Sequence, residues 1–306
     1  MKDSGHHAID VWLPDLARFA ADHPLRSLLR KADRLPDGAH GYMEGLAEHF
    51  DIPGPIPAGA LTRELIANDA GHDVWLCADP AWVQPDLNGA RLLAYGQMKL
   101  SMEDAQALAE PLMPLFDEAG MALVVSSPNH WHVRLPADIS VPDVAAPEPA
   151  LGEDLYHHLP QGAEGRRWRI LLTEVQVILH QHTHNAARRQ HGMPPINHLW
   201  LWGGGVLPTS VHTSLAQVVG DDLLLDALAR QAGIPAMSRT QSSVASASPG
   251  TLVDLQDLPV DDIAAQWMPS LLALAARHPL QLNFASGERC LHRSWHRLRF
   301  WRGSGR

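Results

Sequence analysis

Residues 197–208 read Asn197-His198-Leu199-Trp200-Leu201-Trp202-Gly203-Gly204-Gly205-Val206-Leu207-Pro208. Four of the first six residues are large and apolar, which predicts a short buried strand. Three consecutive glycines then remove every side chain where the chain is expected to turn, so another group can approach the backbone closely. Ligands of open α/β sheets bind at the carboxyl ends of the strands. We therefore expect a binding site where this strand runs into its glycine loop.

The composition is that of a globular protein without a membrane span. The chain has 306 residues, of which 45% are hydrophobic, and its net charge of −10 comes from 24 basic and 34 acidic residues. That charge argues against binding of nucleic acid or of an acidic membrane by the whole chain. Two distant cysteines, Cys77 and Cys290, fit a reducing compartment. With no signal peptide or long apolar stretch in the sequence, we expect a cytoplasmic protein.

Prolines and short apolar runs divide the chain into three predicted parts. Residues 1–135 are expected to form an N-terminal α+β region that begins with a helical segment, 136–150 a linker, and 151–306 a C-terminal α/β region. The linker is predicted because prolines interrupt helices and central strands. Alternating helical and strand patterns favour an α/β fold with a mixed sheet flanked by helices. Strands are expected at 74–78, 91–95, 121–126, 131–135, 215–219, 280–284 and 289–292, and helices at 101–118, 167–189, 221–231 and 261–277.

The expected helix at 167–189 carries polar side chains along one flank of its apolar face. These residues are Glu174, Gln181, Asn185 and Arg188. A carboxylate, two amides and a guanidinium could together bind a polar ligand, and arginine suits a phosphate or carboxylate through paired hydrogen bonds. The alternative is that Glu174 pairs locally and Arg188 is solvated.

Two groups of residues are candidate ligands for a divalent metal such as Mn, Mg or Zn. His180 and His184 are four positions apart on the same expected helix and could share an ion, although no His-Glu-x-x-His sequence is present. The alternative is a buried His182 between two exposed histidines. Asp221 and Asp222 follow an expected strand and could bind a cation or act as acid and base. The alternative is that Asp221 caps the next helix.

The end of the chain combines arginines with aromatic residues, a combination that can bind nucleic acid or a protein partner. In an acidic chain the same arginines could instead bind the chain's own acidic surface. The residues are Arg289, Arg293, Arg297, Arg299, Arg302 and Arg306, with Trp295, Phe300 and Trp301 among them.

Several of these residues together resemble a family of bacterial proteins, the RpfE-type regulatory proteins, which are often labelled phosphoglycerate mutase. The resemblance covers most of residues 70–302 and rests on Thr173-Glu174-Val175-Gln176, Leu179-His180, Asn185, Arg188, Gly192 and the stretch 197–205. A more distant similarity links the Trp-Leu-Trp-Gly strand to archaeal-type cofactor-independent phosphoglycerate mutases. This similarity implies part of an alkaline-phosphatase-like fold.

Those mutases use two metal ions, held by Asp and His residues that begin with an Asp-Gly pair after the first strand, and a Ser or Thr that takes the phosphoryl group. Here the Asp-Gly pair is Asp37-Gly38, which follows no expected strand. Without two metals, the charge on a transferring phosphoryl group would go largely unneutralised. The resemblance therefore implies a mutase-like scaffold and leaves the activity open.

Three hypotheses follow. The first is a mutase-like protein that lacks the full two-metal site and binds an anionic or phosphorylated ligand in a regulatory or binding role. Its pocket would be lined by Glu174, Gln181, Asn185, Arg188, Asn197, Trp202, Gly203, Gly204 and Gly205. The second is an active metal-dependent phosphomutase or phosphatase that uses His180, His184, Asp221 and Asp222. The third is a module that binds protein or, less in keeping with its charge, nucleic acid through the C-terminal arginines.

Overall fold

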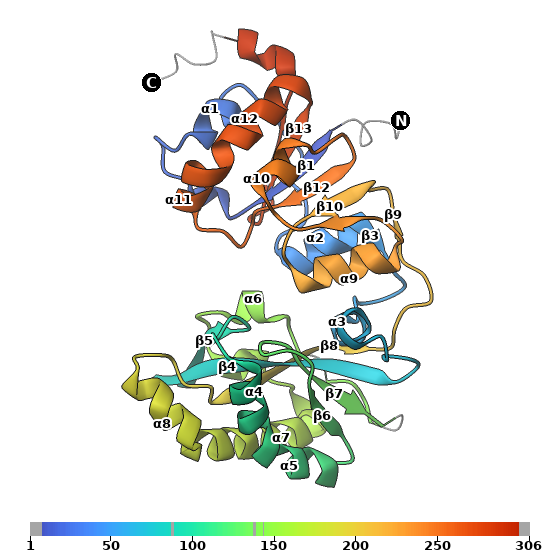
Figure 1. Cartoon of the computed structure of the whole chain (residues 1–306), viewed down its shortest axis with the longest axis vertical. Coiled ribbons are helices and arrows are strands. Elements are labelled where there is room, and N and C mark those ends of the chain that lie inside the picture. The colour runs from blue at the N-terminus through green and yellow to red at the C-terminus, as the bar shows by residue number, and fades with distance from the viewer. Residues whose placement is uncertain (1–7, 87–88, 137–138, 143, 300–306) are drawn as a thin grey trace. The chain divides into compact units, whose positions relative to one another are not determined.

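The computed structural model describes residues 8–86, 89–136, 139–142 and 144–299. The chain forms two compact units (Figure 1). Unit 1 comprises Met1–Ile52 and Ser210–Arg306, and unit 2, Pro53–Thr209, is inserted between these two segments. The proline-rich stretch 136–150, expected to be a linker, lies inside unit 2. The compact units are therefore divided elsewhere, near residues 52 and 210.

Unit 1 is built on a seven-stranded sheet with the order β11-β10-β12-β1-β13-β14-β2. The first five strands run parallel, and β14 and β2 continue the sheet in antiparallel fashion. In this order the strands are Ala236–Met237, Gln217–Val219, Thr251–Asp254, Ile9–Leu13, Leu280–Phe284, Arg289–His292 and Asp33–Leu35. The expected strands at 280–284 and 289–292 are confirmed.

The expectation of a purely helical N-terminal segment is wrong, because β1 lies in the middle of this sheet. All five of its residues are buried, as is usual for a parallel strand covered on both faces. Such a strand shows no alternation of polar and apolar residues, so the sequence pattern does not predict it. The pair Asp37-Gly38 also follows a strand after all, the short edge strand β2.

Helices cover both faces of the unit 1 sheet (Figure 1). One face carries α2 (Tyr42–His49) and α9 (Leu223–Gln231), and the other carries α1 (Leu25–Leu29), α10 (Gln241–Ala245) and α12 (Met268–Arg277). The second group packs on the main core of the unit, which includes Val11, Leu13, Val253, Leu271 and Leu282. Smaller elements are α11 (Val260–Asp262), a π-helical turn at Ile263–Trp267, 3-10 turns at Leu16–Arg18 and Ser294–Leu298, and the pair β3 (Phe50–Asp51) and β9 (His212–Thr213).

Unit 2 is built on an antiparallel sheet around the long strand β4 (Val74–Asp86). Strands β5 (Gly89–Tyr95) and β7 (Trp131–Leu135) pair with different parts of β4, and β6 (Ala122–Val125) extends the sheet beyond β7. The Trp-Leu-Trp strand, β8 (His198–Gly205), also pairs with β4 in antiparallel fashion. The whole chain is thus a mixed α/β protein with sheets flanked by helices, as the sequence predicts.

The helices of unit 2 divide between the two faces of its sheet. The core on one face joins α4 (Met102–Ala109), α5 (Met113–Glu118) and α7 (Gly162–Gln181) to Leu76, Ala78, Leu199 and Leu201. Helix α3 (Ala58–Ala67) packs against β4 and β8 near Trp75. The remaining elements are α6 (Pro147–Ala150), α8 (Thr183–Gln190) and 3-10 turns at Glu110–Leu112 and Leu155–His158. No helix of the described residues combines the length and the apolar character of a membrane span.

Candidate functional site

The three glycines of the Trp-Leu-Trp strand are used for packing. They are the last residues of β8 rather than a loop that follows it. Gly203 has φ +62°, and a Cβ atom there would lie 2.5 Å from the Cβ of Ala58, while one on Gly205 would lie 2.8 Å from the Cβ of Pro57. A Cβ atom on Gly204 would contact the side chains of Leu76 and Val141. The start of α3, rather than a ligand, makes the close approach at Gly203 and Gly205.

The strand direction also removes the original reason for expecting a site at this point. The rule about carboxyl ends concerns parallel strands, and β8 is antiparallel to its neighbour β4. Asn197 bonds both the N–H (2.8 Å) and the carbonyl (2.7 Å) of Val83, so it joins the two strands. Trp202 donates its indole N–H to the buried Asp79 carboxylate at 2.7 Å.

The four residues of the polar flank expected at 167–189 differ in their surroundings. The helix is interrupted at His182, whose extended backbone ends α7 and begins α8. Glu174 and Gln181 are exposed. Asn185 is buried and bonds the carbonyls of Leu179 (2.7 Å) and Ile196 (2.6 Å).

Arg188 is buried as well, so the alternative of a solvated guanidinium is wrong. It is 5% exposed and donates to the carbonyls of Pro194 (2.9 Å) and Met98 (2.6 Å). Burial lowers its pKa. Asn185 and Arg188 therefore brace the connection between α8 and β8.

The candidate metal ligands belong to two different units of the chain. His180 and His184 lie in unit 2, on either side of the helix break, whereas Asp221 and Asp222 lie in unit 1. Across the described part of the chain, no group of three or more His, Cys, Asp or Glu residues is arranged to hold a metal ion. The expected cap is displaced by one residue: Asp222 rather than Asp221 caps α9, by accepting the N–H of Leu225 at 2.8 Å.

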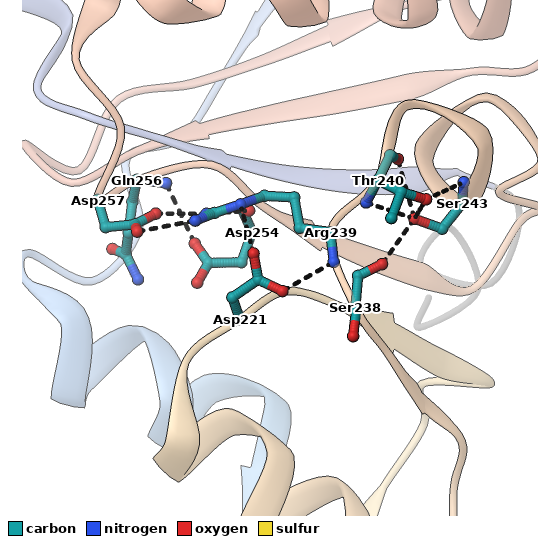
Figure 2. Close-up of polar contacts among 8 residues, drawn as sticks. All are labelled: Asp221, Ser238, Arg239, Thr240, Ser243, Asp254, Gln256 and Asp257. Atoms are coloured by element: carbon teal, nitrogen blue, oxygen red, sulfur yellow. Dashed lines mark hydrogen bonds and ion pairs between the residues drawn. The ribbon is translucent and has the colours of Figure 1, made fainter. Parts of the chain in front are cut away.

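The carboxyl ends of the parallel strands in unit 1 form the best-defined polar site (Figure 2). Asp221 and Asp222 follow β10, Arg239 follows β11, and β12 ends in Asp254, with Asp257 close behind. The connection after β10, helix α9, covers one face of the sheet, and the connection from β12 through α12 covers the other. Neighbouring strands whose connections diverge in this way leave a crevice where ligands of α/β proteins bind.

Arg239 lies among these carboxylates. Its side chain is 7% exposed. It contacts both carboxylate oxygens of Asp257, at 2.8 Å for one of the two bonds, and donates to the main-chain carbonyl of Asp254 at 3.0 Å. Its Nε lies 3.4 Å from Asp221, whose carboxylate also accepts the backbone N–H of Arg239 at 2.9 Å.

Local structure holds Arg239 in this position. It is bounded by β11 on one side and on the other by Thr240, the first residue of a capping box. Thr240 accepts the N–H of Ser243 at 3.0 Å, and Ser243 accepts the N–H of Thr240 at 2.9 Å. The Ser243 hydroxyl also donates to the carbonyl of Ser238 at 2.7 Å. The guanidinium is thus anchored from both ends of its short segment.

The site keeps protons at higher pH than isolated carboxylates do. Burial raises the pKa of Asp254 to about 7, with a smaller contribution from Asp222. Burial also raises the pKa of Asp226, on α9, to about 6, and both Asp222 and Asp221 add to this effect. One guanidinium does not cancel the negative charge here, so proton uptake near neutral pH lowers the remaining repulsion.

A pocket adjoins this site where β1 and β13 end. Its polar and aromatic lining residues are Trp12, Tyr42, Glu48, Gln256, Asn283, Phe284 and Arg289. The Tyr42 hydroxyl donates to Asp222, and Arg289 forms an ion pair with Glu48. Asn283 donates to Asp10 at 3.2 Å, and burial raises the pKa of this Asp10 carboxyl. The lining thus offers hydrogen-bonding groups, an aromatic wall and one cation, the Arg289 guanidinium.

Arg239, Asp254 and Asp257 are not among the site residues expected from the sequence. The available signal was Gly250-Thr251-Leu252-Val253-Asp254, a glycine followed by a short apolar run that ends in a carboxylate. The run is brief, and the segment before it is rich in serine, which obscured the strand.

The C-terminal arginines that the structure describes bind the chain's own acidic residues. Arg293 and Arg299 pair with Asp33 at 3.0 and 2.6 Å, and Arg299 also lies over the ring of Trp295, 4.5 Å from its centroid. This matches the self-binding alternative. Phe300, Trp301, Arg302 and Arg306 lie outside the described residues, as does the side chain of Arg297.

No protein-family profile matches the chain. A 2,3-bisphosphoglycerate-independent phosphoglycerate mutase of Methanosarcina barkeri is 25% identical over 216 residues, which are 61% of this chain and 53% of that protein. A probable mutase of the same kind from Geobacter sulfurreducens is 34% identical over 65 residues, 21% of this chain and 16% of that one. The chain is a distant homologue of these mutases. It spans about half of their length or less.

Two solved structures also align with most of the chain. A protein from Pyrococcus horikoshii has 11% identity and a TM-score of 0.44, over 94% of this chain and 87% of that one. A cofactor-independent phosphoglycerate mutase from Thermoplasma acidophilum has 15% identity and a TM-score of 0.37, over 94% and 89%.

The acidic site of unit 1 does not fit the two-metal centre that the mutase resemblance implies. The space between Asp221, Asp254 and Asp257 holds a cation of the chain itself, the Arg239 guanidinium. A divalent ion needs the same carboxylate oxygens.

Proposed function

We propose that this protein is a phosphoglycerate-mutase-like binding protein with a regulatory role, which recognises a small phosphorylated or carboxylate ligand without two-metal phosphoryl transfer. The observation that carries the proposal is the Arg239 guanidinium among the carboxylates of unit 1. It supplies one positive charge, whereas phosphoryl transfer by two metals relies on a much larger charge at the reacting group. The distant mutase homology supports the choice of ligand, and the RpfE-type resemblance supports the regulatory role.

The pocket beside this site is the proposed ligand site. Arg289 lines it with a side chain that is 24% exposed and paired with the Glu48 carboxylate. A phosphate or carboxylate of the ligand would replace Glu48 on the guanidinium, since arginine binds all of these oxyanions through paired hydrogen bonds. The amide of Gln256 and the ring of Trp12 would contact the rest of the ligand.

Two substitutions should change binding in opposite directions. Removing the charge of Arg289 by Arg289→Gln should abolish binding, whereas Glu48→Gln should strengthen it because it frees the guanidinium. The measurement is thermal stabilisation by 3-phosphoglycerate, with glycerol and inorganic phosphate as reference compounds. Arg293→Gln, which removes another arginine of unit 1 from its ion pair with Asp33, is the matched control. Equal stabilisation of wild type and Arg289→Gln would refute this ligand site.

Binding should also strengthen as pH falls from about 8 to about 6. Asp254 and Asp226, with pKa values of about 7 and about 6, take up protons in this range and lower the repulsion of an anion. Isothermal titration of 3-phosphoglycerate at both pH values measures the effect. Mutase turnover by wild type on addition of Mn, Mg or Zn would instead establish the active enzyme.

A further inference from the structure

A chain of hydrogen bonds in unit 2 links Ser126 to the buried His132. The Ser126 hydroxyl lies 2.6 Å from Nδ1 of the imidazole, and the Thr62 hydroxyl lies 2.9 Å from its Nε2. Arg63 donates to the Ser126 oxygen at 2.8 Å. His132, Thr62 and Arg63 are buried, whereas Ser126 is partly exposed. Ser126 is therefore the member of this chain of hydrogen bonds that is most open to solvent.

Three segments of unit 2 hold these side chains together. His132 belongs to β7, and Ser126 directly follows β6, which pairs with β7 in antiparallel fashion. Thr62 and Arg63 come from helix α3, which packs against β4 and β7. Gly59 permits this packing, because a Cβ atom there would lie 2.6 Å from a main-chain oxygen of β4. The positions of the imidazole and the hydroxyl are therefore fixed by the fold of the unit.

The hydrogen bonds determine which nitrogen of His132 carries the proton. The Thr62 hydroxyl donates its one proton to the carbonyl of Ala58 at 2.7 Å. It therefore accepts a hydrogen bond from His132, which places the imidazole proton on Nε2. Nδ1 is then an acceptor, and it receives the O–H of Ser126, since the Arg63 guanidinium can only donate to that oxygen. The network thus holds a neutral imidazole with its basic nitrogen on the serine hydroxyl.

This arrangement is that of a nucleophile and its general base. A serine hydroxyl becomes a useful nucleophile when an adjacent base accepts its proton and a third group orients the base, here Thr62. Arg63 places a positive charge beside the reacting oxygen, where it stabilises negative charge that develops during attack. The guanidinium is itself held by both carboxylate oxygens of Asp69 and lies over the ring of Trp75, 4.9 Å from its centroid.

The charge at the site favours an acyl group over a phosphoryl group. Attack on a carboxylic ester develops one negative charge on the carbonyl oxygen, which a single guanidinium can match. Phosphoryl transfer spreads more negative charge over several oxygens and relies on metal ions or several cations.

We propose that Ser126 is a nucleophile for acyl transfer, with His132 as its general base, and that unit 2 hydrolyses small carboxylic esters at this site. Ser126 Oγ attacks the carbonyl carbon of the ester while its proton passes to Nδ1 of His132. The bond to the alcohol oxygen breaks, and the alcohol leaves with that proton. Water then attacks the acyl-serine and gives a proton to the same nitrogen; the bond to Oγ breaks, and Oγ regains the proton. This activity is separate from the ligand binding proposed for unit 1.

The environment of His132 gives the reaction a distinctive pH profile. Burial, with smaller contributions from Arg63 and His130, lowers the pKa of His132 to about 3 against an opposing effect of Asp69. The imidazole therefore stays unprotonated between about pH 5 and about pH 8, and the acylation rate should be flat over this range. A base with the ordinary pKa of 6.5 would instead lose activity below that pH. The low basicity of His132 also predicts slow turnover.

The test combines labelling by phenylmethylsulfonyl fluoride with hydrolysis of p-nitrophenyl acetate, both by the full chain. Mass spectrometry should find one sulfonyl group on Ser126 of wild type. Ser126→Ala should lose this label and about tenfold or more of the esterase rate. Ser127→Ala is the matched control, since it removes the neighbouring hydroxyl, which accepts the backbone N–H of His130, and should keep both. His132→Gln should slow labelling of Ser126 by about tenfold or more. Far-ultraviolet circular dichroism establishes that each variant is folded.

The proposal is overturned if wild type is not labelled at Ser126, if folded Ser126→Ala keeps the esterase activity, or if Ser127→Ala loses as much. A labelling rate of wild type that falls as pH drops through 6.5 would overturn the role of His132, even where His132→Gln does not fold. Stabilisation by 3-phosphoglycerate reports on Arg289 and should be equal in wild type and Ser126→Ala, so failure of the ligand proposal is recognised separately.

Discussion

The Asp254 carboxyl should make the stability of unit 1 depend on pH, and replacing it with asparagine should remove that dependence. Asp254 is 2% exposed and ends the parallel strand β12. Its carboxylate accepts the backbone N–H of Gln256 at 3.1 Å, a bond that the side-chain oxygen of an asparagine can keep. The substitution Asp254→Asn therefore removes the ionisable group with little change of shape.

The direction of this pH dependence follows from the raised pKa of Asp254. Burial raises the pKa of Asp254 from 3.8 to about 7, so the native state keeps a proton that the unfolded state releases above about pH 4. The contribution of the protonated Asp254 carboxyl to the free energy of unfolding is fully present below pH 3.8 and is lost as pH rises to about 7. Between pH 5 and pH 7 the loss is two pH units at 1.36 kcal/mol each, or about 2 to 3 kcal/mol, and no more is lost above pH 7.

The assay is urea unfolding at about pH 5 and about pH 8, followed by far-ultraviolet circular dichroism. The stability of Asp254→Asn relative to wild type should increase by about 2 to 3 kcal/mol between the two pH values. Asp261→Asn, which changes an exposed carboxylate of α11 in the same unit, should show no such increase. If wild type and Asp254→Asn change in parallel with pH, the assignment of a retained proton to Asp254 is wrong.

Two further predictions concern packing in unit 2. Gly203→Ala should lower stability by about 2 to 5 kcal/mol, because an alanine at φ +62° is strained and its Cβ would clash with Ala58. Gly54→Ala is the control: at φ +85°, with nothing within 4 Å of its added Cβ, it should cost only the backbone strain of about 1 to 2 kcal/mol. Thermal melts compare the two variants, and equal losses of stability in Gly203→Ala and Gly54→Ala would contradict a packing role for Gly203. Asn185→Ala should cost about 3 kcal/mol or more, since it leaves buried main-chain groups unpaired. The exposed Gln181→Ala should stay within about 0.5 kcal/mol in urea unfolding, and a similar small loss for Asn185→Ala would argue against bracing.

Local patterns were enough to predict several elements. The strands at 131–135, 280–284 and 289–292 match β7, β13 and β14, and the helix expected to begin at residue 101 starts there as α4, with Ser101 as its cap. These segments carry their own signals, because turn residues and caps act within a few positions of the chain. Strand β1 carries no such signal, since burial on both faces erases the alternation of polar and apolar residues.

The division into units also depended on distant contacts. Proline content pointed to a boundary at 136–150, but the chain leaves unit 1 near residue 52 and returns near residue 210. Only the parallel pairing of β1 with β12 and β13 shows that the two ends of the chain build one sheet. Composition along the chain does not record which distant strands pair.

The sequence by itself determined the α/β class, most of the local elements, the mutase resemblance and the presence of a buried Trp-Leu-Trp strand that ends in three glycines. The tertiary structure decided what that strand does: its antiparallel pairing and its contacts with Pro57 and Ala58 make it a packing surface for α3. The structure also brought Arg239 into contact with Asp221, Asp254 and Asp257, which lie 15 or more positions away. A site assembled from the ends of separate strands has no local signature, because its geometry exists only once the sheet has formed.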